Sequence, residues 1–83
     1  MIAMVEVADI NNAYGNPVAE LVQTACRFDS HITVSCDGKY INAKSLMGMM
    51  AFGLKKGMQV EISADGADET QAVETIKNFL ACK

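Results

Sequence analysis

The sequence predicts an α+β fold, a two-layer sandwich in which strands and helices follow one another in the order βαββαβα. In four segments apolar and polar residues alternate, as in strands with one buried face; in others apolar residues recur at steps of three and four, as in helices with one apolar stripe. Elements of these two kinds pack as a sheet on one side and helices on the other. With 83 residues the chain is expected to form a single domain, residues 1–83, around one core.

A strand and a helix are expected first. Apolar side chains alternate with others over residues 3–7, and the segment 11–16 (NNAYGN) then breaks the pattern with ordinary turn formers. Pro17 suits a first helical turn. The apolar stripe that follows predicts the first helix: Val18, Leu21, Val22, Ala25 and Phe28.

A hairpin, a short helix, a strand and a final helix complete the order. Alternation over residues 32–36 and a return over 39–42 flank an Asp-Gly turn, which is typical of a hairpin. Ser45 is a suitable N-cap for a short helix that runs to about residue 51, and residues 59–64 alternate as the fourth strand. The last helix is predicted by acidic residues in its first turn and by a second apolar stripe: Ala72, Val73, Ile76, Phe79 and Leu80.

Composition excludes several classes of function. The net charge of −3 has the wrong sign for gripping a phosphate backbone, so no direct nucleic-acid partner is expected. No run of about 18 apolar residues is present, so no membrane span is expected. Three cysteines without a CxxC pair predict neither a zinc site nor a complete disulfide set, and they favour a cytoplasmic location. We expect these cysteines to be small buried residues, with Cys82 frayed, and we expect no metal, cofactor or enzymatic motif.

Three blocks of the sequence match a known family. The most specific is residues 42–53 (NAKSLMGMMAFG); the others are LVQTA at 21–25 with FDS at 28–30, and ADG at 64–66 with the following Asp-Glu pair. Through these blocks nearly the whole chain resembles the HPr family, the histidine-containing phosphocarrier proteins of the bacterial sugar phosphotransferase system. The resemblance implies an HPr-like open-faced sandwich, a four-stranded antiparallel sheet covered on one face by helices.

The family's active-site segment is where this chain departs from the pattern. That segment reads GIHARPA, whereas the matching stretch here is NAYGNPV at 12–18, which shares only Pro17. Tyr14 therefore occupies the phosphohistidine position, and Asn16 occupies the position of the arginine that holds the phosphate in the family. The chain is thus similar to a Crh-like member, the catabolite-repression type, that lacks the active-site histidine.

A tyrosine is expected to be a poor substitute in the relay chemistry that the resemblance assigns to the histidine. Phosphohistidine passes its group on because its P–N bond is cleaved easily once the ring is protonated, whereas a phenol, with a pKa of about 10, gives a stable ester. Asn16 can hydrogen-bond a phosphate but brings no charge. The only histidine, His31, follows the first helix and lies roughly 16 Å from Tyr14 along the helix axis, so we interpret it as a solvent-facing residue that opens a strand.

Ser45 is the predicted regulatory phosphorylation site. A phosphate on an N-cap serine complements the helix dipole, and Lys44 lies beside it in the sequence. The resemblance implies HPr kinase/phosphorylase as the modifying enzyme and the LacI-type catabolite control repressor as the reader. The simpler interpretation is that Ser45 only caps its helix, which contributes about 0.5–2 kcal/mol.

An apolar cluster after Ser45 predicts a partner-binding surface: Leu46, Met47, Met49, Met50, Phe52 and Leu54. A helix of two turns cannot bury all of these side chains, so about half should be core, with Met47 and Met50 as the exposed pair. In the family this patch and the start of the first helix dock enzyme I, IIA domains and the repressor. The expected partner-binding residues are therefore Tyr14, Gly15, Asn16, Lys44, Met47 and Met50.

The sequence predicts an HPr-like regulatory and binding protein that is not an enzyme, has lost histidine phosphotransfer and uses Ser45 as a switch. Two alternatives stay open. One is a phosphocarrier with Tyr14 as an atypical phosphoacceptor. The other is a vestigial partner-binding domain that uses neither site.

Overall fold

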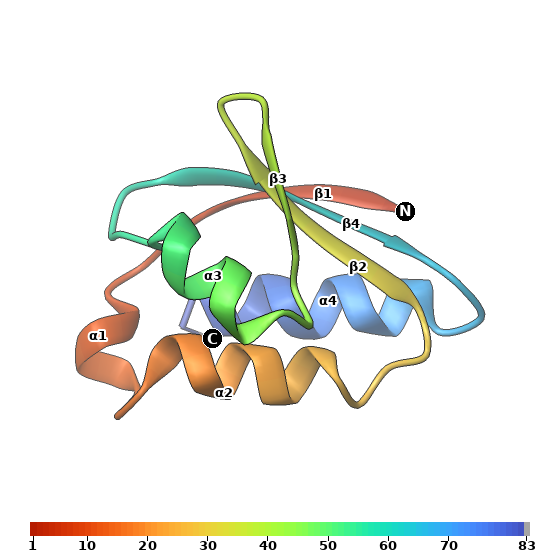
Figure 1. Cartoon of the computed structure of the whole chain (residues 1–83), viewed down its shortest axis with the longest axis horizontal. Coiled ribbons are helices and arrows are strands. Elements are labelled where there is room, and N and C mark those ends of the chain that lie inside the picture. The colour runs from red at the N-terminus through yellow and green to blue at the C-terminus, as the bar shows by residue number, and fades with distance from the viewer. Residues whose placement is uncertain (83) are drawn as a thin grey trace.

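The computed structural model describes residues 1–82 and contains an antiparallel four-stranded sheet with helices packed on one face, which confirms the predicted α+β sandwich (Figure 1). The strands lie in the order β1-β4-β2-β3. The elements are β1 (Ile2–Glu6), α1 (Ile10–Ala13), α2 (Pro17–Ala25), β2 (His31–Cys36), β3 (Lys39–Asn42), α3 (Leu46–Phe52), β4 (Gln59–Asp65) and α4 (Glu69–Leu80). No helix in this part of the chain is both long and apolar enough to cross a membrane.

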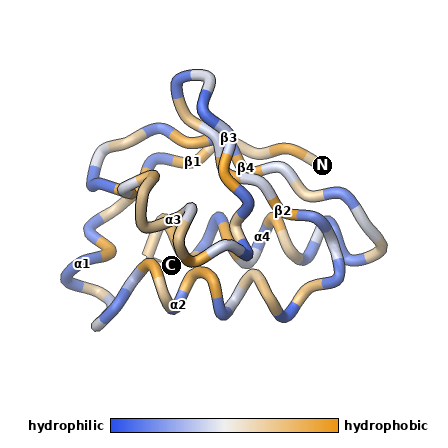
Figure 2. The backbone as a smooth tube through the Cα atoms, viewed as in Figure 1, coloured by the Kyte–Doolittle hydropathy of each residue, from blue (hydrophilic) through white to orange (hydrophobic). Residues whose placement is uncertain are grey.

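The core lies between the sheet and the helices α2 and α4, and it contains the residues that the two apolar stripes predict. Apolar residues are interleaved with polar ones along these helices, so that each helix can turn one face inward (Figure 2). Fully buried side chains of α2, α4 and the inward positions of the strands include Leu21, Ala25, Ile32, Val34, Val60, Ile62, Ala72, Ile76 and Leu80. Burying this surface is the main favourable term in folding.

The structure contains one short helix, α1, that the predicted order βαββαβα does not include. Residues Ile10–Ala13 form a single helical turn where the sequence pattern indicates only a loop. Ile10 is 1% exposed, and the Asn12 amide donates to the Asp9 carboxylate at 2.6 Å. One turn is too short to show a periodic apolar stripe, so burial of a single isoleucine leaves no signal in the sequence.

The prediction of buried cysteines was wrong for Cys26 and Cys36, whereas the exposure of Cys82 agrees with the prediction that it is frayed. Cys26 and Cys82 are exposed and Cys36 is half-buried. Cys26 and Cys36 lie at the ends of α2 and β2, and Cys82 follows α4. At the end of an element the core no longer covers every side chain, and a position in the apolar pattern does not ensure burial there.

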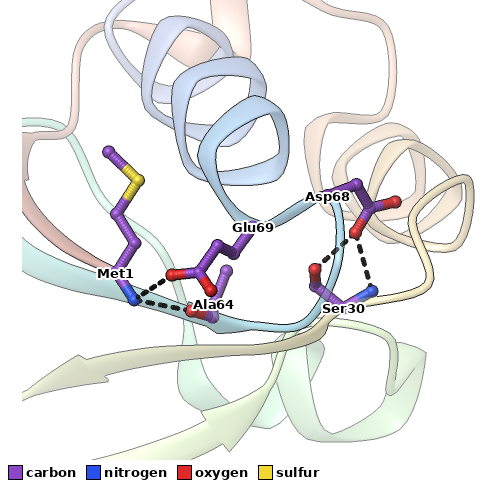
Figure 3. Close-up of polar contacts among 5 residues, drawn as sticks. All are labelled: Met1, Ser30, Ala64, Asp68 and Glu69. Carbon is purple, nitrogen blue, oxygen red and sulfur yellow. Dashed lines mark hydrogen bonds and ion pairs between the residues drawn. The ribbon is translucent and has the colours of Figure 1, made fainter.

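A carboxylate joins the turn between α2 and β2 to the start of α4. Asp68 accepts hydrogen bonds from the backbone N–H groups of Asp29 and Ser30, both at 2.9 Å, and from the Ser30 hydroxyl (Figure 3). The Ser30 hydroxyl, followed by the backbone donors, holds the pKa of Asp68 below its ordinary value. A Cβ on Gly66 would lie 2.7 Å from the Ser30 Cα, so this approach requires glycine. Asp68 therefore does more than add charge to a helix start.

The first strand is held at its beginning by a second set of contacts in the same region. The Met1 amino group donates to the Ala64 carbonyl and to the Glu69 carboxylate, both at 2.8 Å (Figure 3). The hydrogen bond and the positive charge of that amino group lower the pKa of Glu69.

Candidate functional site

The side chain of Tyr14 turns onto the C-terminal end of α4. Its ring stacks on the Phe79 ring with a centroid distance of 4.1 Å and an interplanar angle of 4°. Its hydroxyl donates to the Phe79 carbonyl at 3.1 Å, and the residue is half-buried. An aromatic pair of this kind contributes about 0.5–1.5 kcal/mol and the hydrogen bond about 1 kcal/mol. Tyr14 thus connects the start of α2 to the end of α4.

The surroundings of the Tyr14 hydroxyl make it a poor nucleophile. Burial raises the pKa of the phenol above its ordinary value of 10.0, and the negative charges of Cys82, when ionised, and Glu20 raise it further. The phenol therefore stays protonated near neutral pH. A protonated hydroxyl that already donates to a carbonyl has no enhanced reactivity toward phosphorus.

The N-terminus of α2 is capped by its own polar side chains. The Asn16 amide oxygen accepts from the Ala19 backbone N–H at 3.4 Å, and the Asn16 backbone N–H donates to the Glu20 carboxylate at 3.2 Å. Asn16 and Gly15 are exposed, and a Cβ on Gly15 would have nothing within 4 Å. Glu20, which no sequence motif marks as a site residue, puts a negative charge where a phosphate carrier needs a positive one.

Ser45 is the N-cap of α3, as the sequence predicts. Its Oγ accepts from the Gly48 backbone N–H at 3.2 Å, and the residue is half-buried. A Cβ on Gly48 would lie 3.1 Å from this oxygen and 3.2 Å from the Ile41 side chain, so glycine lets the helix start pack closely on β3. The hydroxyl lies at the positive end of a helix, where added negative charge is favourable.

Lys44, next to the cap, points to the end of α2. Its Nζ donates to the Phe28 carbonyl at 2.6 Å, and its backbone N–H donates to the Asn42 side chain at 2.9 Å. The ammonium is therefore already bound by a carbonyl in the turn after α2. This contact lies beyond the C-terminal end of α2, whereas Tyr14 precedes the start of that helix.

The apolar cluster divides between surface and core as predicted. Met47 is 84% exposed and Met50 64% exposed, whereas Met49 is fully buried and Leu54 is 8% exposed. Leu46, which sequence reasoning did not select, is also exposed. The surface made by Leu46, Met47 and Met50 is called the α3 patch below.

His31 is exposed and is the first residue of β2, which confirms its interpretation as a solvent-facing residue that opens a strand. It lies beyond the C-terminal end of α2, at the far end from Tyr14. Within residues 1–82 no group of three or more His, Cys, Asp or Glu side chains is placed to hold a metal ion.

The chain is similar to known phosphocarrier proteins in both sequence and structure. The family model of the PTS HPr component phosphorylation site matches residues 3–81. HPr-C-His from Thermoanaerobacter tengcongensis is 36% identical with a TM-score of 0.88, over 98% of this chain and 91% of that chain. HPr from Bacillus anthracis str. Ames is 34% identical with a TM-score of 0.89, over 96% and 95%.

A further solved structure is Bacillus subtilis Crh, described as a catabolite repression protein that forms a dimer by domain swapping. It is 34% identical with a TM-score of 0.75, over 93% of this chain and 84% of that chain. These similarities confirm the HPr-like architecture and the resemblance seen in the sequence. The chain therefore belongs to the HPr family of the phosphotransferase system.

Proposed function

We propose that this chain is a regulatory, protein-binding member of the HPr family, acting as one cytoplasmic domain, which does not relay phosphate through a histidine and uses Ser45 as its switch. The observation that carries the proposal is the position of the Tyr14 side chain. It is stacked on the Phe79 ring and hydrogen-bonded to the Phe79 carbonyl, and these contacts stabilise the fold. A relay needs an accessible nucleophile, and the chain's only histidine is at the other end of α2.

Two features count against Tyr14 as an alternative phosphoacceptor. Its raised pKa and engaged hydroxyl disfavour attack on phosphorus, and Glu20 repels an anion at the start of α2. An ester formed there would also be a poor donor, because a phenolic ester lacks the easily cleaved P–N bond. Tyr14, Gly15 and Asn16 are proposed as the rim of a partner-binding surface and not as a reaction centre.

The Ser45 region has the features of a switch that proteins read. Phosphorylation adds a charge of about −1.5 to −2 at the start of a helix, where the dipole stabilises it. The exposed Met47 and Met50 lie in the following turns, so that a reader can contact a phosphate and a deformable apolar surface together. We propose HPr kinase/phosphorylase as the modifying enzyme and the catabolite control repressor as the reader, with enzyme I and IIA domains as further candidates for the same surface.

A kinase assay tests the switch. The chain is incubated with ATP and HPr kinase/phosphorylase, and phosphate is counted by intact-mass spectrometry on the parent, on Ser45→Ala and on the control Ser63→Ala, which removes a half-buried serine of β4. One phosphate on the parent and on the control, and none on Ser45→Ala, is expected. Equal labelling of Ser45→Ala, or an unlabelled parent, contradicts the proposal.

A further inference from the structure

The face of the sheet opposite the helices is uncovered by the described residues (Figure 1). Strand register places a continuous row of outward-facing residues across it. Met4 is opposite Glu61, Glu61 is opposite Ser35, and Ser35 is opposite Tyr40. The row therefore crosses all four strands, from β1 to β3.

This row has apolar ends, an acidic centre and a polar floor. Tyr40 is 72% exposed and Met4 57% exposed, which is high for side chains of this size, whereas Ser35 is only 8% exposed. Two shallow hollows, of about 270 and 300 Å³, meet here, and Ser35, Tyr40 and Glu61 line both of them. Ile2, 63% exposed, extends the apolar surface along β1. We call this surface the Tyr40 face.

The charge on the Tyr40 face is of one sign. The charged side chains that line the hollows are those of Asp37 and Glu61, both acidic. The one ion pair that the described residues form joins the Met1 amino group to Glu69, so it leaves Asp37 and Glu61 without a cationic partner. A carboxylate set between a methionine and a tyrosine attracts a cation with an apolar stem.

We propose that the Tyr40 face binds an arginine-bearing peptide segment of a partner protein. The planar guanidinium donates two parallel hydrogen bonds to the Glu61 carboxylate and stacks on the Tyr40 ring, and its aliphatic stem packs on Met4. The Ser35 hydroxyl, at the floor, accepts a further N–H. An ammonium matches this arrangement less well, because it neither stacks as a plane nor forms the paired contact.

The proposed surface is separate from the α3 patch. It is on the opposite side of the sheet from the helices, so one molecule can hold an arginine peptide while a second protein contacts Met47 and Met50. The inference therefore does not rest on phosphorylation of Ser45. A second copy of this chain is a poorer occupant, because its single arginine, Arg27, comes with the acidic net charge of the whole chain.

Amide chemical shifts test the proposal. The isotope-labelled chain is titrated with a five-residue peptide that carries one arginine flanked by leucines, and with the same peptide carrying citrulline, which keeps the shape but not the charge. Saturable shifts are expected at amides of residues 2–6, 33–40 and 59–63. Because the ion pair and the cation–π contact both depend on the charge, the citrulline peptide should bind about tenfold more weakly.

Variants separate this contact from general attraction of a basic peptide to an acidic protein. Glu61→Gln and Tyr40→Ala should each weaken binding by about tenfold. Glu74→Gln removes an exposed acid of α4, on the helix side of the sheet. It should change affinity less than twofold, because salt screens the attraction between exposed charges that are far apart. Tyr40 and Glu61 are not core residues, and unchanged melting curves will show that the variants fold.

Several results would overturn the proposal: no shift with millimolar peptide, shifts centred on α2 and α3, equal binding of the citrulline peptide, or equal loss in Glu61→Gln and Glu74→Gln. A dimer in light scattering that Tyr40→Ala converts to a monomer would also overturn it, since a second copy would then cover the face.

Discussion

Tyr14 and Ser45 each carry a hydroxyl and each precede a helix in the sequence, but their side chains make different contacts. Tyr14 donates inward, to the Phe79 carbonyl, and its ring is stacked on Phe79. Ser45 accepts a backbone N–H from its own helix and is followed by methionines that face solvent. The difference lies in what each side chain already contacts: the Tyr14 hydroxyl is used by the fold, whereas the Ser45 hydroxyl caps a helix beside an exposed surface, where we propose that it is modified.

The largest expected change in stability follows removal of the Tyr14 side chain. Tyr14→Ala should lower the free energy of unfolding by about 2–3 kcal/mol, because it removes the stack, the hydrogen bond and half-buried apolar area. Urea denaturation measures the change. The matched control is Tyr40→Ala, which removes the chain's other tyrosine from an exposed position and should change stability by less than about 0.5 kcal/mol. Equal losses of stability in the two variants would mean that the contacts of Tyr14 with Phe79 do not stabilise the fold.

The phenol itself is tested by a smaller change. Tyr14→Phe keeps the ring and loses the hydrogen bond to the Phe79 carbonyl, which should cost about 1 kcal/mol. Ser45→Ala should cost a similar amount, about 1 kcal/mol, since it removes a helix cap. Urea denaturation should therefore give Tyr14→Ala a clearly lower free energy of unfolding than Tyr14→Phe or Ser45→Ala. A neutral Tyr14→Phe would show that the stack alone holds the ring.

Sequence predicted the fold better than it predicted these contacts. Alternation and apolar stripes repeat over a whole strand or helix, so they located the four strands and the helices α2 and α4. The Ser45 N-cap located α3, and the shortness of that helix predicted the exposure of Met47 and Met50. The Tyr14 contact joins residues 65 positions apart, and one of its partners is a backbone carbonyl, which every residue has. Contacts of that kind are created by tertiary packing and have no local pattern.

The contact between the Asp68 carboxylate and the turn after α2 should be sensitive to acid. The pKa of Asp68 is lowered in the folded chain, so its contribution to stability is present above the ordinary value of 3.8 and is lost as pH falls through the lower folded value. Asp68→Asn should therefore destabilise the chain at neutral pH and flatten this acid dependence. Urea midpoints at pH 7 and below pH 3.8 measure it. Glu74→Gln is the control, and an identical pH profile in both variants would refute the role of Asp68.

The Lys44 side chain, next to Ser45 in the sequence, should stabilise the same turn after α2. Lys44→Met keeps the apolar stem and removes the hydrogen bond to the Phe28 carbonyl, so stability should fall by about 1 kcal/mol. Amide hydrogen exchange should quicken at residues 26–30 and not at the start of α2. Uniform acceleration across the helix would show that the contact has no local effect.

The smallest effect on stability is expected in the α3 patch. Replacing Met47 and Met50 together by serine should leave the free energy of unfolding within about 1 kcal/mol, because both side chains are exposed, while reducing affinity for the repressor. Calorimetry and a binding titration measure the two quantities. Met49→Ser, which places a hydroxyl in the core, should unfold the chain. Unchanged binding by the double variant would remove the patch from the proposed interface.

Phosphate transfer from phosphoenolpyruvate shows whether this chain has lost the histidine relay. The chain is incubated with enzyme I and labelled phosphoenolpyruvate beside an HPr that carries the active-site histidine. Acid-labile label is expected on that control and none on this chain, because the Tyr14 hydroxyl is hydrogen-bonded to the Phe79 carbonyl and His31 lies at the other end of α2. Stoichiometric label on Tyr14 or His31 that passes on to a IIA domain would contradict it.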